Sequence, residues 1–303
     1  MSLDASVDAL SRGRAFVDLS DWKKLAVRGG DARTWLNDLV SADLRGLRPG
    51  HGCRSLLLSP TGGVRAEFGV AIRDDAILLL QDPLQPRSVG DLLAPYVLSS
   101  DVRLADETDE LALVAFPRDP GDLHVGAPTV DRVSPSCAGD TGGVDLLAPA
   151  EVRGALVAEL AAAHESAGPD ALEAWRVAAG VPRVAVDASA ADLPDEIGLA
   201  GAVSGDKGCY LGQEAVAKAR NLGHPRRVLL HLAAEAPVEA GDEVLADGAA
   251  VGVVTSAARV NGAWIALVRV QWDARELPLH AASGAGMRRV PGRGERPGVT
   301  SPL

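Results

Sequence analysis

The residue with the clearest capacity for chemistry is Cys209, in the stretch Ser-Gly-Asp-Lys-Gly-Cys-Tyr-Leu-Gly-Gln-Glu at residues 204–214. Helix formers follow Gly212, and they predict a helix whose entrance is formed by residues 206–209. A thiol at a helix N-terminus experiences the partial positive charge of the helix dipole, and Lys207 adds an ammonium group nearby. Both charges favour the thiolate, so the spacing indicates a reactive cysteine.

The same stretch also has a purely structural interpretation. Unpaired cysteines are often small buried residues without reactivity, and local chemistry supports this interpretation as well as it supports a reactive Cys209. Gln213 would share a helix face with the thiol, because it lies four residues further on. Glu67 presents a similar choice, since a strand position after a glycine-rich hairpin suits either a pocket carboxylate or a solvated strand face.

The sequence contains no familiar signature for nucleotide binding, hydrolysis or metal binding. It has no phosphate-binding loop, no dinucleotide fingerprint, no serine-hydrolase elbow and no zinc-protease motif. His51 and Cys53 are of metal-ligating type, but no second pair accompanies them, so we interpret this segment as a polar loop before a strand. No metal site is therefore predicted.

Composition and charge limit the classes of function. The chain has 303 residues, of which 47% are apolar, and its formal net charge is −11. This excess of acid argues against general binding to nucleic acids or anionic membranes, and we interpret the basic residues at 220–227 as a solvated loop. The acidic start and the short apolar runs predict neither a secretory signal nor a membrane span. The three cysteines are far apart and form no CxxC pair, which predicts a reducing, cytoplasmic environment.

Strands and helices alternate through the first part of the chain, which indicates an α+β architecture. A helix is predicted to begin at Asp31. Two strands, at 53–58 and 64–72, are joined by Ser-Pro-Thr-Gly-Gly, which is a hairpin signal. The other elements that bear on the site are predicted as a leader strand or turn segment, a helix and a short strand, at residues 7–25, 169–179 and 184–186.

The pattern changes after residue 225. Short strands follow one another at even spacing, separated by Gly-Asp, Asp-Gly and Asn-Gly turns, and they predict a small barrel or sandwich. These strands are expected at 228–232, 243–246, 250–256 and 263–272. From about residue 283 the composition turns to Gly, Arg and Pro, which is typical of a mobile tail.

The stretch Lys-Gly-Cys-Tyr-Leu-Gly-Gln-Glu at 207–214 resembles the signature of the YgfZ-like folate-binding proteins, which are relatives of the glycine cleavage T-protein, an aminomethyltransferase. Lys207, Tyr210 and Gly212 are shared with the aminomethyltransferase branch, whereas Cys209, Gln213 and Glu214 mark the YgfZ-like branch. The resemblance covers most of the chain, because further segments are similar to the superfamily in the same order, at 27–43, 57–70, 175–182 and 252–256.

The resemblance implies an α+β, GcvT-like fold of two interleaved α+β subdomains followed by a small C-terminal β-barrel. The folate-binding α+β region is expected to span residues 1–222. Its subdomains, the barrel and a flexible tail are expected at 1–48 with 118–222, at 49–117, at 223–282 and at 283–303.

The resemblance also implies a function, namely binding of tetrahydrofolate or a derivative and assistance in the assembly or repair of iron–sulfur clusters. In that function Cys209 is the working thiol and Lys207 stabilises its thiolate. The implied partners are folate and iron–sulfur client or assembly proteins. A single cysteine cannot hold a cluster alone, so any contact with a cluster would be transient or shared. The residues assigned to the folate are Glu67, Arg176, Tyr210, Gln213 and Glu214.

Two other functions stay open. In a folate-dependent aminomethyltransferase or methyltransferase, Glu67 would be the carboxylate at the reacting folate nitrogens. The acidic pair that the aminomethyltransferases carry there is reduced to this one residue, and the segment at 132–143 lacks the glutamate of their Arg-x-Gly-Tyr-Thr-Gly-Glu motif. A non-catalytic folate sensor or scaffold is the third possibility, and it requires a pocket but no thiol.

Overall fold

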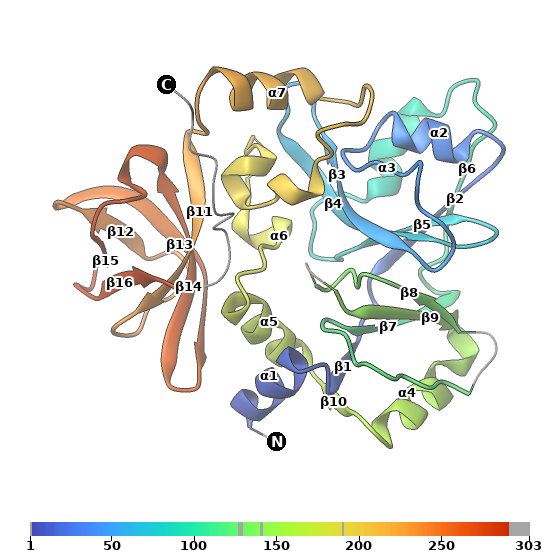
Figure 1. Ribbon diagram of the computed structural model, residues 1–303, viewed down its shortest axis with the longest axis horizontal. Coiled ribbons are helices and arrows are strands. Elements are labelled where there is room, and N and C mark those ends of the chain that lie inside the picture. The colour runs from blue at the N-terminus through green and yellow to red at the C-terminus, as the bar shows by residue number, and fades with distance from the viewer. Residues whose placement is uncertain (1, 127–129, 140–141, 190, 291–303) are drawn as a thin grey trace.

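The computed structural model describes residues 2–126, 130–139, 142–189 and 191–290, and it confirms the predicted α+β fold (Figure 1). The described chain forms two five-stranded sheets and a closed barrel. Two central helices, α5 (Pro169–Ala178) and α6 (Val184–Asp187), lie between the barrel and the sheets (Figure 1). Both helices contact the long barrel strand β13 (Ala249–Val260), so they join the barrel to the rest of the molecule.

The first sheet has the strand order β10-β1-β7-β9-β8, and only the β1–β10 pairing is parallel. Helix α1 (Leu3–Ser11) packs against α5 beside this sheet, and Trp175 of α5 is fully buried in the core that they share. Helix α4 (Arg153–Ala161) packs on the sheet through Leu156 and Leu160. The strands are β1 (Ala15–Asp18), β7 (Leu111–Phe116), β8 (Asp131–Val133), β9 (Val144–Pro149) and β10 (Glu165–Ala167).

The second sheet is wholly antiparallel, with the order β3-β4-β5-β2-β6. Alternate residues of β4 point to opposite faces, as a pleated strand requires. Ala66, Phe68 and Val70 lie in the core beneath helices α2 (Ala32–Asn37) and α3 (Val89–Leu93), so Glu67 and Gly69 face the other way. The strands are β2 (Lys23–Arg28), β3 (Gly52–Leu58), β4 (Val64–Ile72), β5 (Ile77–Gln81) and β6 (Arg103–Asp106).

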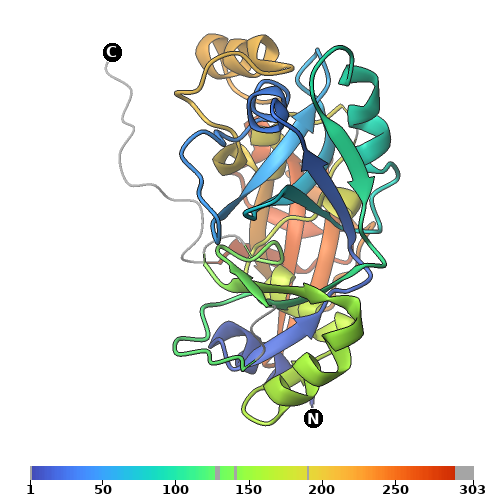
Figure 2. The same ribbon diagram turned by 90° about the vertical axis from the view of Figure 1, so that its right-hand side faces the viewer.

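The chain passes between the two sheets twice, because β1 and β2 are consecutive in sequence but belong to different sheets, and β7 returns to the first. In the turned view the two sheets lie above one another, with the barrel strands behind them (Figure 2). The faces that the sheets turn toward α5 are therefore built from segments far apart in sequence.

The C-terminal barrel closes in the order β11-β14-β13-β12-β15-β16. Strand β16 (Gly286–Arg289) pairs with β11 (Arg227–Ala234) and with β15 (Leu279–Ala281), and these pairings complete the barrel. The remaining strands are β12 (Glu243–Ala246) and β14 (Ala263–Gln271). The expected start of the tail at residue 283 is therefore wrong, because residues 286–289 form β16, which the composition does not indicate. Residues 291–303 of the expected tail lie outside the described residues.

Among the local predictions for the first part of the chain, some were wrong and others are confirmed. The segment 7–25 was expected to begin as a strand or turn, but helix α1 precedes β1, because Val7 and Leu10 form one buried helical face after the Ser2 cap. Residues 184–186 are part of the single turn α6 rather than a strand. The hairpin at 59–63 and the helices at Asp31 and 169–179 are confirmed.

Across the described residues, none of the helices combines the length and the apolar character that crossing a bilayer requires.

Candidate functional site

A cavity of about 520 Å³ lies between the two sheets and helix α5. This volume is within the range of small-molecule sites, and the lining mixes apolar side chains with several charged ones. We refer to it as the central cavity. The charged and polar residues of its lining are Asp18, Asp21, Arg54, Glu67, Asp82, Gln85, Arg153, Glu173, Arg176 and Arg183.

Glu67 contributes a carboxylate to the central cavity, since it lies on the face of β4 opposite the α2–α3 core. Its side chain is only 14% exposed, and it forms an ion pair with Arg54 of β3. The backbone N–H of Val184 donates to the same carboxylate at 3.1 Å, while Arg54 also donates to the carbonyl of Pro182 at 2.6 Å. Glu67 is therefore a cavity carboxylate, not a solvated one, and its charge is balanced by an arginine.

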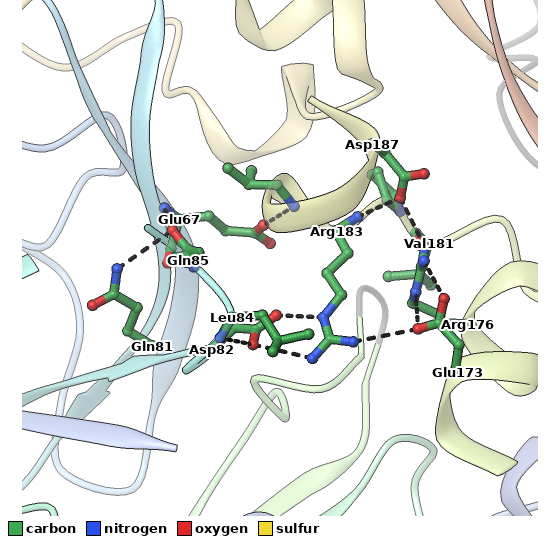
Figure 3. Close-up of polar contacts among 12 residues, drawn as sticks. Glu67, Gln81, Asp82, Leu84, Gln85, Glu173, Arg176, Val181, Arg183 and Asp187 are labelled. Atoms are coloured by element: carbon green, nitrogen blue, oxygen red, sulfur yellow. Dashed lines mark hydrogen bonds and ion pairs between the residues drawn. The ribbon is translucent and has the colours of Figure 1, made fainter. Parts of the chain in front are cut away.

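A second buried carboxylate, Asp82, follows β5 at the edge of the cavity. Arg183 approaches it with two nitrogens: Nε donates to Oδ2, and Nη2 donates to Oδ1 at 3.0 Å (Figure 3). The backbone N–H of Leu84 also donates to Oδ1 at 2.9 Å, which fixes the carboxylate within its turn. Nη1 of Arg183 lies 3.4 Å from the carboxylate of Glu173 on α5, so this arginine spans the cavity between β5 and α5 (Figure 3).

Arg176 lies in the cavity wall, but its guanidinium N–H groups donate hydrogen bonds to other protein groups. It donates to the buried carboxylate of Asp187 at 2.8 Å and to Oγ of Ser256 at 2.7 Å, and it pairs with Glu173. Ser256 in turn donates to Asp187 at 2.6 Å. A buried charge cluster of this kind is strongly destabilised when one member is removed. Arg176 therefore ties α5 and α6 to the barrel and keeps the cavity wall in place.

Cys137 also lines the central cavity, beside a buried carboxyl group. Asp145 accepts hydrogen bonds from the Ser136 hydroxyl at 2.6 Å and from the Cys137 backbone N–H at 2.7 Å. Burial raises the pKa of Asp145 to about 6. Burial, together with the nearby Asp145 charge, also raises the pKa of the Cys137 thiol well above its ordinary value. This thiol is protonated at neutral pH and is a weak nucleophile.

The Cys209 loop, residues 204–212, lies outside the central cavity, and its thiol is exposed. The predicted helix entrance at 206–209 is wrong, because helix α7 (Gln213–Leu222) begins only after Gly212. Gly212 has a φ of +83°, and a Cβ there would lie 2.4 Å from the carbonyl oxygen of Ser59. Glycine is thus required where the loop packs on the β3–β4 hairpin, and the thiol precedes the helix rather than opening it.

Lys207 holds this loop against helix α2. Its ammonium donates to the backbone carbonyls of Asn37, Val40 and Ala42, which lie at and just after the C-terminal end of α2. Burial lowers the pKa of Lys207 to about 8. Because these carbonyls take the ammonium's donors, the geometry assigns Lys207 to anchoring the loop. Within the described part of the chain, no hydrogen bond joins Lys207 to the thiol of Cys209.

The other residues of the predicted site also belong to this loop or to α7. Tyr210 lies beneath the Lys207 ammonium, with 5.3 Å from Nζ to the ring centroid. Gln213 accepts from the backbone N–H of Tyr210 at 3.0 Å, and its Nε2 lies 3.9 Å from Sγ of Cys209. Glu214 is exposed in the first turn of α7. None of these residues lines the central cavity.

The structure therefore divides the predicted site into two regions. Glu67 and Arg176 belong to the central cavity, whereas the five predicted site residues within the 207–214 motif lie apart from it. Several charged cavity residues were not predicted from the sequence, among them Asp82, Glu173 and Arg183. A polar residue directly after a buried strand was the available signal for Asp82. Among the described residues, no group of three or more His, Cys, Asp or Glu side chains is arranged to hold a metal ion.

Several known proteins that are similar to this chain are named as transferases, although no protein-family model matches it. A putative chloroplast transferase of Arabidopsis thaliana is 29% identical over 276 residues, covering 84% of this chain but only 64% of that protein. The aminomethyltransferase of Streptomyces coelicolor is 28% identical over 300 residues, covering 88% of this chain and 79% of the relative.

A solved structure has the same fold. The crystal structure of the glycine cleavage system aminomethyltransferase T of Bartonella henselae superimposes with a TM-score of 0.78 over 93% of this chain and 87% of that one, at 18% identity. An aminomethyltransferase of Mycobacterium leprae is 30% identical over 265 residues, covering 79% of this chain and 72% of the relative. The chain belongs to the aminomethyltransferase family.

Proposed function

We propose that this protein binds tetrahydrofolate or a derivative in the central cavity and acts as a folate-dependent transferase of the aminomethyltransferase kind. The observation that carries the proposal is the cavity itself, about 520 Å³ in volume and lined by both carboxylates and arginines, within the fold of that family. A reduced folate has an aminopyrimidinone that donates hydrogen bonds and a glutamate tail that accepts them. Both kinds of partner are present in the lining.

Group transfer is favoured over iron–sulfur assembly because relatives of this chain are named as transferases. In such a transfer Glu67 would lie near the folate nitrogens and stabilise positive charge that develops there. Its ion pair with Arg54 keeps the carboxylate in place but offsets part of its charge. We therefore expect Glu67 to contribute to the transfer step more than to binding.

The experiment combines calorimetry with a turnover assay on the full chain. We expect tetrahydrofolate to bind wild type, and an aminomethylated or methylated donor to be consumed only when tetrahydrofolate is present. Glu67→Gln should slow the transfer at least tenfold while changing the affinity less, because it removes a charge without removing bulk. Binding of tetrahydrofolate without any turnover would contradict the transferase function and favour a folate sensor or scaffold. No binding at all would contradict the whole proposal.

A second candidate function rests on a separate observation. Cys209 is exposed on a loop that Lys207 anchors, and the 207–214 motif resembles that of the YgfZ-like branch. In this function the thiol contacts iron–sulfur client or assembly proteins, and the folate pocket tunes that contact. Replacing Cys209 with Ala in cells and assaying cluster-dependent enzymes tests it: reduced activities support the candidate, and wild-type activities contradict it.

We also propose that the chain divides into two interleaved subdomains and a barrel that begins at about 223. The boundaries expected at 48 and 117 do not follow the strand pairings, because β2 (Lys23–Arg28) pairs within the sheet of β3 to β6, and β7 (Leu111–Phe116) pairs within the other sheet. We therefore place these boundaries before β2 and before β7. The barrel in this division includes β16, whose last residue is Arg289.

A further inference from the structure

The pairing of Asp82 with Arg183 has the geometry of a ligand contact. Two nitrogens of one planar fork, Nε and Nη2, meet the two oxygens of one carboxylate (Figure 3). The side chain of Asp82 is 6% exposed, so this is the least hydrated carboxylate that an ion pair places in the central cavity. The N–H of Leu84 donates to Oδ1 independently, and so the carboxylate would keep its position if the arginine moved.

The donor pattern of the arginine fork is also that of an aminopyrimidinone edge. The N3–H and the 2-amino group of a 2-amino-4-oxopyrimidine are parallel donors with nearly the spacing of Nε–H and Nη2–H, and a carboxylate accepts either pair with two hydrogen bonds. A reduced pterin presents this edge. Asp82 can therefore receive a pterin in the cavity with the same two oxygens that it now offers to Arg183.

Arg183 has a second acceptor within reach. Its Nη1 lies 3.4 Å from the Glu173 carboxylate, whose side chain is 40% exposed and lies across the cavity on α5. Release from Asp82 would leave the arginine paired and partly hydrated, while the pterin edge would satisfy Asp82. The exchange thus avoids the large cost of an unpaired buried charge.

We infer that Asp82 is the acceptor for the aminopyrimidinone edge of a reduced pterin, and that Arg183 competes with the ligand for it and moves to Glu173 on binding. This inference rests on the proposed folate function of the cavity. The competing explanation is a static ion pair that only supports the cavity wall. The two explanations predict opposite effects for loss of the arginine.

Calorimetric titration of 5-formyltetrahydrofolate into the full chain separates them. Asp82→Asn should weaken binding about a hundredfold, because the negative charge is lost and one of the two acceptor oxygens becomes an NH2 group that faces a donor of the ligand. Arg183→Gln should tighten binding about fivefold, because the competitor is weakened. A static wall pair predicts weaker binding in both variants, and that result would overturn the inference.

A matched control comes from the pair Arg269–Asp192, which is similarly buried, with side chains 18% and 5% exposed, but lies outside the central cavity. Arg269→Gln should change the affinity less than twofold. Tighter binding in this control as well as in Arg183→Gln would show a general loosening and would also contradict the inference.

The ligand can be varied instead of the protein, which covers the case in which Asp82→Asn does not fold. Wild type should prefer tetrahydropterin over tetrahydrolumazine, which carries oxygen in place of the 2-amino group, by about tenfold or more. Equal affinities would contradict the inference while leaving folate binding intact. Failure of wild type and Arg183→Gln to bind any of these compounds would contradict both the inference and the proposed function.

Discussion

The central cavity and the Cys209 loop are built in different ways. The cavity is lined by charges that neutralise one another, Glu67 with Arg54 and Asp82 with Arg183, on segments from both sheets and α5. The loop carries one exposed thiol, and Lys207 attaches it to backbone carbonyls at and after the end of α2. The first arrangement suits recognition of a polar ligand, whereas the second suits contact with a partner. The 207–214 motif therefore lies apart from the cavity that we propose as the ligand site.

The largest effect on stability is expected from removing Arg176, which holds the cavity wall in place. Arg176→Leu leaves Asp187 buried without its arginine, and we expect a loss of about 3–5 kcal/mol in the free energy of unfolding, measured by urea denaturation. The exposed pair Arg45–Asp43 provides the control, since Arg45→Gln should cost at most about 1 kcal/mol. A loss below 1 kcal/mol in Arg176→Leu would show that this cluster does not hold the wall.

The next effect is a pH dependence that arises at the cavity. The pKa of Asp145 is raised from 3.8 to about 6, so the folded state binds more protons than the unfolded state between these values. The contribution of protonated Asp145 to the free energy of unfolding is fully present below about pH 4 and is lost as the pH rises through 6. Asp145→Asn removes the titration, so its stability relative to wild type should improve by about 2–3 kcal/mol from pH 4 to 7. A constant difference across this range would contradict the raised pKa.

A smaller effect is expected at the loop. Lys207→Met leaves the carbonyls of Asn37, Val40 and Ala42 without their shared donor, which should cost about 1–3 kcal/mol. The loosened loop should let iodoacetamide alkylate Cys209 faster, while the affinity for 5-formyltetrahydrofolate stays within about twofold. Lys218→Met on the exposed face of α7 is the control, with neither change. A large loss of folate affinity in Lys207→Met would couple the two regions.

The smallest effect is expected from the thiol itself. Cys209 is exposed and packs against little, so Cys209→Ser should change the free energy of unfolding by less than about 0.5 kcal/mol. Alkylation of the exposed thiol should disappear, which mass spectrometry can check against Cys53 and Cys137. A destabilisation above 1 kcal/mol would show that the thiol has a packing role after all.

Local signals explain which parts of the fold could be predicted. The β3–β4 hairpin follows from five adjacent residues, and the evenly spaced turns after residue 225 indicated a barrel. Strand alternation assigned Glu67 to one face of its strand, but the sequence left open whether that face lines a pocket or meets solvent. The long-range polar contacts could not be predicted, since Arg183 and Asp82 are 101 residues apart in sequence, and Lys207 and the backbone carbonyl of Asn37 are 170 apart. Their meeting depends on how the sheets pack, which no local pattern encodes.

The start of the helix at the cysteine motif also depends on long-range contacts that no local pattern encodes. Residue propensities predicted a helix near 206–220, and α7 exists, but its start depends on Gly212 packing against Ser59 of the distant hairpin. The role expected for Lys207 changed for the same reason, because the carbonyls that it binds belong to α2 and the loop after it. Only tertiary contacts decide which neighbour a flexible lysine meets.

The central claim, that the cavity and not the Cys209 loop binds reduced folate, is tested most directly by one calorimetric comparison. Leu172 lines the cavity from α5, and Leu172→Trp would fill the space without removing a polar group. We predict that 5-formyltetrahydrofolate binds wild type and Cys209→Ser with affinities within about twofold, and binds Leu172→Trp at least fiftyfold more weakly. Binding that survives in Leu172→Trp, or that is lost in Cys209→Ser, would contradict the claim.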